Sequence, residues 1–141
     1  MSEKLIVGSL ETCALPDLGI TDLQVRVDTG AKTSSLHVDN VKKFTKEGKT
    51  WVKFDIHPDV YNVETVTHCE SALHDIRSIK SSNGNSEKRF VIKTPLKMGD
   101  RSWSIEVTLT NRADMTYLML LGREGMKDHI LVDPSKTFML D

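Results

Sequence analysis

The chain has 141 residues, with 19 basic and 20 acidic side chains and a formal net charge of −1. With 38% hydrophobic and 28% charged residues, its composition is typical of a soluble globular protein, and its length suits one domain spanning residues 1–141. The balanced charge argues against a general nucleic-acid binder and against electrostatic attachment to a membrane.

No apolar run reaches the roughly 18 residues of a membrane-spanning helix, and the first residues have too short an apolar stretch for a signal peptide. We therefore expect a cytoplasmic protein. In that reducing compartment Cys13 and Cys69 are expected to be thiols that behave as small buried apolar residues, and a disulfide between them is the less favoured alternative.

Alternating apolar and polar residues, typical of half-buried strands, dominate the chain. The first such strand is predicted at residues 23–27. Glu47-Gly48-Lys49 predicts a hairpin turn between residues 41–44 and an alternating strand at residues 51–56.

A longer hairpin is predicted where residues 76–80 and 89–93 flank a polar loop, residues 81–86, that contains an Asn-Gly turn signal. Met98-Gly99-Asp100 predicts a turn before an alternating strand at residues 103–109. Strands at residues 117–121 and 130–132 follow, with one helical turn at residues 123–128 between them. Many short strands and a single helical turn predict an all-β fold, a sandwich or a barrel.

The most informative motif is Asp28-Thr29-Gly30, which directly follows the strand at residues 23–27. Aspartic proteases use this tripeptide: the Asp presents a carboxylate at a tight turn, the Thr hydroxyl can fix the loop, and the Gly lets backbone amides approach the carboxylate. The tripeptide alone occurs by chance in roughly a few per cent of chains of this length. A simple turn after a strand is therefore the competing interpretation.

Aspartic protease chemistry needs two carboxylates that share one proton, so that one acts as base toward water and the other as acid toward the scissile carbonyl. The chain contains one Asp-Thr-Gly and no Asp-Ser-Gly. The catalytic hypothesis therefore requires a homodimer in which each protomer supplies one Asp28.

The context of the tripeptide resembles a retropepsin half-site, with Asp-Thr-Gly-Ala first, then a hairpin at the position of a flap, then Leu120-Leu121-Gly122-Arg123 and a helical turn. Nearly the whole chain is similar, in order, to a bacterial and archaeal retropepsin-like family that carries the label ATP-dependent zinc protease. That resemblance implies a closed retropepsin-like (acid protease) β-barrel with one short C-terminal helix. Members are often associated with ATP-grasp ligases that add glutamate to ribosomal protein tails.

The same resemblance implies the site residues. The catalytic loop is Asp28, Thr29 and Gly30, and the substrate-binding residues are Ala31, Lys32, Ser81, Ser82, Asn83, Gly84 and Arg123, with residues 81–84 as the flap. Viral retropepsins carry acidic residues after Asp-Thr-Gly-Ala, whereas this chain has Lys32-Thr33. Arg123 therefore lacks its expected acidic partner, and a more acidic substrate becomes plausible.

The zinc and ATP in the family label have no counterpart in the sequence, because neither the H-E-x-x-H spacing nor a P-loop is present. His68, Glu70 and His74 share a strand face, but about 20 Å would separate the two histidines. We therefore expect no metal and no cofactor, and surface or hydrogen-bonded positions for His37, His57 and His129.

Five basic residues fall in or beside the motif segments, where they form either one cleft for a carboxylate-rich peptide or scattered surface charge: Lys32, Arg77, Arg89, Arg112 and Arg123. Trp51 and Trp103 are expected to pack in the core or an interface. The favoured function is a homodimeric aspartic endopeptidase, with a glutamate-rich substrate and a functional link to an ATP-grasp ligase. The alternatives are a non-catalytic peptide- or partner-binding module on the same scaffold and a metallopeptidase.

Overall fold

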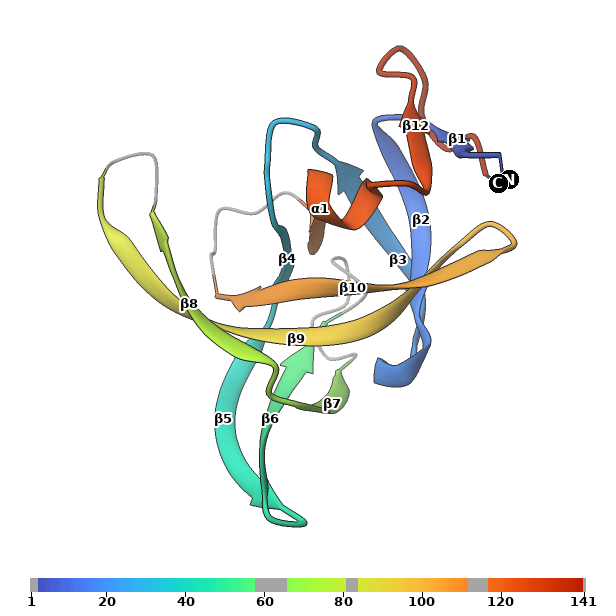
Figure 1. The fold of residues 1–141 in the computed structure, drawn as a ribbon. Helices are drawn as coiled ribbons and strands as arrows, with labels where there is room; N and C mark the ends of the chain where they lie inside the picture. The colour runs from blue at the N-terminus through green and yellow to red at the C-terminus, as the bar shows by residue number, and fades with distance from the viewer. Residues whose placement is uncertain (1–2, 58–65, 81–83, 112–116, 141) are drawn as a thin grey trace.

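The computed structural model describes residues 3–57, 66–80, 84–111 and 117–140. The chain is built almost entirely of strands (Figure 1). They are β1 (Leu5–Val7), β2 (Leu10–Leu15), β3 (Ile20–Val27), β4 (Ser34–His37), β5 (Asp39–Lys46), β6 (Lys49–Ile56), β7 (Thr67–Ala72), β8 (Asp75–Lys80), β9 (Ser86–Met98), β10 (Arg101–Thr110), β11 (Met119–Leu121) and β12 (Ile130–Val132). A 3₁₀ turn, η1 (Pro16–Leu18), and one short helix, α1 (Arg123–Met126), complete the fold.

Six of the strands form a closed barrel in the order β10-β4-β11-β3-β2-β9, which the pairing of β9 with β10 closes. Two of the contacts are parallel: β3 with β11, and β4 with β10. The predicted all-β class, closed barrel and short helix near the C-terminus are confirmed. Because β3 and β11 run in parallel with Val27 beside Leu121, the segments that follow the two strands emerge side by side.

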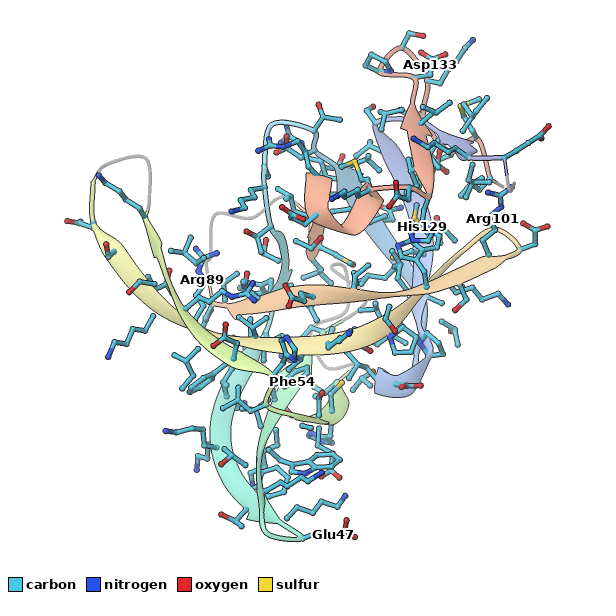
Figure 2. The ribbon with its side chains drawn as sticks, viewed as in Figure 1. Glu47, Phe54, Arg89, Arg101, His129 and Asp133 are labelled. Carbon is cyan, nitrogen blue, oxygen red and sulfur yellow. The ribbon has the colours of Figure 1, made fainter. Side chains whose placement is uncertain are left out.

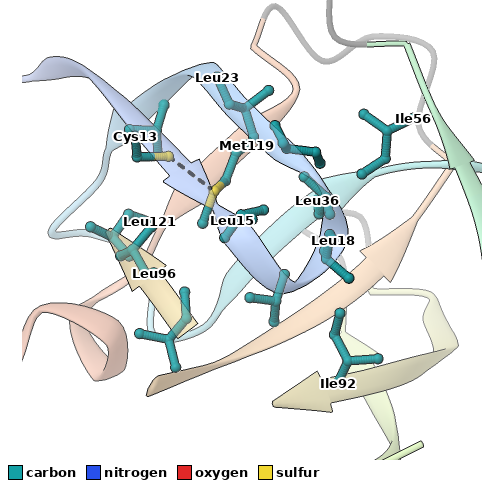
Figure 3. Close-up of a cluster of buried hydrophobic side chains, with 14 of the residues drawn as sticks. Cys13, Leu15, Leu18, Leu23, Leu36, Ile56, Ile92, Leu96, Met119 and Leu121 are labelled. Atoms are coloured by element: carbon teal, nitrogen blue, oxygen red, sulfur yellow. Dashed lines mark hydrogen bonds between the residues drawn. The ribbon is translucent and has the colours of Figure 1, made fainter. Parts of the chain in front are cut away.

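The barrel core follows from the period-two pattern. From Leu23 to Val27 of β3, Leu23, Val25 and Val27 are buried and the alternating Gln24 and Arg26 are exposed. Figure 3 shows the packed interior, where the Cys13 thiol lies 3.8 Å from the sulfur of Met119. The labelled core side chains come from strands spread along the chain: Leu15, Leu23, Leu36, Ile92, Leu96, Met119 and Leu121.

The predicted hairpins form. Glu47 and Gly48 both adopt positive φ angles, 53° and 77°, as a two-residue turn between β5 and β6 requires. Gly99, with φ of 60°, closes the turn between β9 and β10. β8 pairs with the first half of β9 from Asp75↔Val91 to Lys80↔Ser86, which is the predicted long hairpin. Its residues 81–83 lie outside the described residues.

β5, β6 and β7 form a separate three-stranded sheet, whose β5–β6 hairpin projects from the barrel at the bottom of Figure 1. Val52, Phe54 and Ile56 of β6 turn their side chains into the shared core. Because side chains alternate along a strand, the intervening positions of β6 face solvent. Sequence periodicity predicted β6 but not β7.

The two ends of the described chain are joined by a buried carboxylate. Glu11 is fully buried, and its side chain accepts hydrogen bonds from the backbone N–H groups of Gly8 (2.7 Å), Met139 (2.9 Å) and Leu140 (3.3 Å). β1 also pairs in parallel with β12. Glu11 therefore fixes the last described residues against the start of β2.

Near α1, the Trp103 indole donates a hydrogen bond to the Gly125 carbonyl (2.8 Å) and stacks on the His129 ring at 4.5 Å between centroids. The packing expected of Trp103 is confirmed, and His129 lies against an aromatic ring. No helix within the described residues is long and apolar enough to cross a membrane.

Candidate active site

Asp28 lies at the end of β3, on the first residue of a tight turn. Its backbone N–H donates to the Leu121 carbonyl (2.9 Å), which extends the β3–β11 pairing by one residue. The Gly30 N–H donates to the Asp28 carboxylate (2.9 Å), and the Ala31 N–H donates to the Asp28 carbonyl (3.2 Å). These bonds hold a half-buried carboxylate at the surface in one orientation.

Gly30 has the role that the sequence predicted. A Cβ atom at this position would lie 3.2 Å from the Asp28 carboxylate oxygen that the Gly30 N–H binds. The glycine thus allows the backbone amide to approach the acid closely.

The segment that follows β11 hydrogen-bonds to the Asp28 loop and packs against it. The N–H groups of Arg123 and Glu124 donate to the carbonyls of Ala31 (2.8 Å) and Lys32 (3.0 Å). A Cβ at Gly122 would lie 2.6 Å from the carbonyl carbon of Thr33, so only glycine fits there. The similarity of residues 120–123 to a retropepsin motif thus corresponds to a physical contact with the Asp28 loop.

The Arg123 side chain also binds the Asp28 loop. No acidic residue follows the Asp-Thr-Gly-Ala motif, and the Arg123 guanidinium instead donates to the backbone carbonyl of Thr29 (2.8 Å). The Thr29 side chain is exposed, and within the described residues its hydroxyl has no hydrogen-bond partner. Thr29 therefore fixes the loop inside this chain through its carbonyl, not through its hydroxyl.

A groove of about 670 Å³ separates the loop from the β8–β9 hairpin. Its walls come from the catalytic loop, from β8, from β10 and from α1, and they combine basic and acidic side chains: Lys32, Thr33, Arg77, Ser78, Ile79, Lys80, Glu106 and Glu124. The strand β8 therefore lies across one open space from Lys32 and Thr33, which follow the Asp28 loop.

Ion pairs connect the base of the flap to the barrel. The Arg77 guanidinium binds both carboxylate oxygens of Glu106 (3.1 and 3.2 Å) and one of Asp75 (2.8 Å), and His74 lies 2.9 Å from Glu106. Hydrogen bonds from Arg77 lower the pKa of Glu106 and of Asp75, and those same bonds raise the pKa of Arg77. The four groups thus form one charged cluster at the flap base.

The structure brings only part of the predicted basic cluster together. Lys32 and Arg77 line the groove, where Lys80 joins them, whereas Arg123 lines a second hollow. Arg89 pairs with Glu87 at 3.2 Å on its own strand. Arg112 lies outside the described residues. Sequence reasoning missed Lys80, Glu106 and Glu124, because ordinary strand and helix positions carry no motif that places them beside Asp28.

Of the predicted flap residues, Ser81, Ser82 and Asn83 lie outside the described residues. Gly84 has a φ of 89°, a left-handed conformation that favours glycine and fits a turn at this end of the hairpin.

The histidines and acids that were weighed as metal ligands bind different partners. His68 pairs with Asp55 (2.6 Å), Glu70 with Lys46 (2.6 Å) and His74 with Glu106 (2.9 Å). No group of three potential metal ligands occurs within residues 3–57, 66–80, 84–111 and 117–140.

Both cysteines are free and buried, as expected. Burial raises the pKa of the Cys13 thiol to about 12 and that of Cys69 to about 11. Neither thiol therefore has the thiolate character that a nucleophile or a metal ligand requires.

A second hollow of about 370 Å³ lies on the other side of the catalytic loop. It is lined by the start of β1, the loop, α1 and β12, among them Lys4, Thr29, Arg123, Asp128 and Ile130. Beside it, the β1–β12 pair exposes the side chains of Ile6 and Leu131, which are register partners and are each 53% exposed.

Comparison with known proteins places this geometry in a family. Residues 6–141 match the model of the RimB-like family, described as retropepsin-like aspartic endopeptidase RimB. Two relatives are named probable alpha-L-glutamate ligase. The one from Shewanella pealeana is 50% identical over 97% of this chain, and the one from Desulfotalea psychrophila is 50% identical over 94% of it. The chain spans only 30% and 28% of the length of these relatives.

A crystal structure of a Legionella pneumophila protein of unknown function superposes with a TM-score of 0.83, at 31% identity, over 99% of this chain and 100% of that one. The chain therefore belongs to the RimB-like family of retropepsin-like proteins.

Proposed function

We propose that this protein is an aspartic endopeptidase that acts as a homodimer, with Asp28 of each protomer forming the catalytic pair. The observation that carries the proposal is the rigid presentation of Asp28. Backbone N–H groups of Gly30 and of Asp28 itself fix the residue, which stays half-buried at the surface, and Lys32 and Thr33, close after it in the chain, line a groove of about 670 Å³.

In the proposed mechanism the two carboxylates share one proton. The ionised Asp28 takes a proton from water as the water oxygen attacks the scissile carbonyl carbon, and the protonated Asp28 gives its proton to the carbonyl oxygen. The resulting gem-diol collapses as the protonated Asp28 gives its proton to the amide nitrogen, the C–N bond breaks, and a gem-diol hydroxyl gives its proton to the other Asp28 as the product carboxylic acid forms. The pair then again holds one proton.

Two features support the dimer. The exposed Ile6–Leu131 pair forms an apolar patch that a two-fold partner of the same chain would cover. The hollow beside it reaches Thr29, whose hydroxyl has no partner among the described residues. A second protomer at this face would therefore adjoin the catalytic loop.

The proposed substrate is a peptide or protein segment rich in glutamate. Lys32 and Lys80 line the groove and make no ion pair with any described residue, so both can bind carboxylates of a substrate. The relatives that carry a similar segment within a longer protein are named glutamate ligases. We therefore propose a functional link between this peptidase and a ligase that attaches glutamate.

The test is cleavage of a glutamate-rich peptide by the Asp28→Asn variant, which retains the shape of the side chain and removes its charge. We expect cleavage to fall by at least about a thousandfold while the thermal unfolding curve stays unchanged. The matched control is Asp22→Asn, an exposed aspartate of β3, which should leave cleavage intact. Full activity of Asp28→Asn would remove Asp28 from the mechanism.

The dimer has its own test. When wild-type and Asp28→Asn chains are co-expressed in equal amounts, random pairing gives wild-type homodimers as about a quarter of all dimers. Activity should therefore fall to about a quarter if both carboxylates are required, and to about half if each protomer works alone.

A further inference from the structure

Four lysines on the solvent side of the β5–β6 hairpin form a surface that the proposed peptidase chemistry does not use. We call it the lysine face: Lys42, Lys46, Lys49 and Lys53. They point to one side because the residues that alternate with them on β6, Val52 and Phe54, are buried in the core.

The register of the hairpin places these lysines directly opposite one another. Lys42 pairs with Lys53, and Lys46 pairs with Lys49, with the aromatic pair Phe44 and Trp51 between them. Like charges directly opposite on an antiparallel pair destabilise the sheet. The arrangement therefore has a cost for the isolated protein, which a bound anionic partner would offset.

One acidic residue of β7, Glu70, lies among these lysines. Lys46 binds the Glu70 carboxylate at 2.6 Å and lies 4.5 Å from the centre of the Trp51 ring. Lys53 lies opposite the same Glu70 in the β6–β7 register, and no ion pair with a described residue is formed by Lys42 or Lys49. Residues 39–56 hold five lysines against three acidic residues, in a chain whose net charge is −1. Positive charge is thus concentrated on this hairpin.

The backbone of the hairpin indicates how a partner would bind. Within the described residues β5 is an edge strand, which pairs only with β6, so its outer hydrogen-bonding groups are unpaired. Lys42 and Lys46 flank that edge on one face, and Lys43 on the other, 5.9 Å from the Phe90 ring. An extended peptide that adds to β5 would therefore meet lysines on both of its faces.

We propose that β5 and the lysine face dock an acidic polypeptide segment, which binds as an additional strand. Successive side chains of an extended peptide alternate between faces at about 3.3 Å per residue. A run of acidic residues therefore matches Lys42, Lys43 and Lys46 in any register. Nucleic acid fits less well, because Lys46 covers the Trp51 ring that a base would need for stacking.

This surface is separate from the groove beside Asp28. None of the four lysines lines that groove, and Figure 2 shows Glu47, at the tip of the β5–β6 hairpin, at the bottom of the view, below the rest of the molecule. The proposal is therefore independent of the catalytic one, and docking can persist in a protein that does not cut peptides.

The test uses the full chain carrying Asp28→Asn, so that no probe is cleaved, and measures binding of a fluorescent decaglutamate peptide. Replacing Lys42 and Lys53 by Gln should weaken binding about five- to tenfold, as the loss of two exposed charge pairs predicts. The matched control replaces Lys97 and Lys127, exposed lysines outside the hairpin, by Gln and should leave binding unchanged. Decaglutamine should not bind.

Hydrogen exchange locates the site. Docking predicts that bound decaglutamate slows exchange of β5 amides. Protection confined to residues 28–33 and 77–80 would place the acidic peptide in the groove alone and overturn the docking proposal, while leaving the peptidase proposal intact. Three other outcomes would overturn the docking proposal as well. One is that decaglutamate does not bind at all, and another is that the Lys-to-Gln variants weaken binding although exchange in β5 is not slowed. The third is that a ten-nucleotide oligothymidine binds more strongly than decaglutamate. Cleavage by the wild-type chain tests the peptidase proposal separately.

Discussion

Residues 32 and 33, which follow the Asp28 loop, and the β8 strand border the same groove, but different kinds of interaction hold these two regions. Around Asp28 the donors are backbone N–H groups: that of Gly30 binds the Asp28 carboxylate, that of Asp28 binds the Leu121 carbonyl, and that of Arg123 binds the Ala31 carbonyl. At the flap base the contacts join partly exposed side chains, with Arg77 and Glu106 at the centre.

The two kinds of interaction should respond to different changes. The close packing behind the loop, where Gly122 lies against the backbone of Thr33, is sensitive to added volume. Ion pairs between exposed side chains are weak, and they respond to pH and salt. The groove therefore combines a closely packed wall, next to the proposed catalytic acid Asp28, with a wall of ion-paired side chains on the β8–β9 hairpin.

The largest expected effect is that of Gly122→Ala on the closely packed wall. The added methyl group would lie 2.6 Å from the Thr33 carbonyl carbon, so we expect the free energy of unfolding to fall by about 3 kcal/mol. Urea unfolding measures this loss, and hydrogen exchange should show faster exchange at residues 28–33.

The control for Gly122→Ala is Gly48→Ala, where a Cβ atom meets nothing within 4 Å. Its cost should be about 1 kcal/mol, from the left-handed φ alone, with no change in exchange at the catalytic loop. Equal costs for the two variants would show that the loop is not tightly packed behind Asp28.

Sequence reasoning succeeded where a local pattern determines the structure. Alternation identified β6 and β10, and turn residues such as Gly48 and Gly99 placed the hairpins. It missed β1, β2, β4 and β7, because such strands gain most of their stability from neighbours that are distant in sequence.

The same distinction holds for the candidate site: residues within a sequence motif were predicted, and residues placed there by the tertiary fold were not. Asp28, Gly30 and Gly122 belong to motifs that are recognisable in the sequence, and the structure brings them into contact. Glu106 was not predicted, since its place in the groove depends on how β10 crosses the barrel. The facing lysine pairs of the β5–β6 hairpin could not be predicted either. They depend on the pairing register of the two strands, and a shift of one residue would move every side chain to the other face of the sheet.

Arg123→Met should have an intermediate effect. The change removes the hydrogen bond to the Thr29 carbonyl and keeps most of the side-chain bulk, so we expect a loss of about 1 kcal/mol. Because the acceptor is an uncharged carbonyl, the loss should be the same at pH 4 as at about pH 7. Chemical unfolding at both pH values checks this, and a loss that disappears in acid would show that Arg123 depends on a carboxylate instead.

The smallest effect is expected from Glu106→Gln at the flap base, below about 1 kcal/mol at neutral pH because the ion pair is partly exposed. Its pH dependence is the informative part. Arg77 lowers the pKa of Glu106 from its ordinary 4.5, so this carboxylate contributes stability above pH 4.5 and loses it as the pH falls through the folded-state value. Unfolding curves of wild type and variant should therefore converge toward low pH.

Glu124→Gln provides the matched control, because Glu124 lines the same groove but forms no ion pair with a described residue. Its effect should be smaller than that of Glu106→Gln at neutral pH. High salt should reduce the Glu106 effect and leave those of Gly122→Ala and Arg123→Met unchanged, since only the flap base is held by charge. A Glu106 effect that is as large in acid as at neutral pH would mean that shape, not charge, holds the flap, and the contrast between the two walls of the groove would no longer stand.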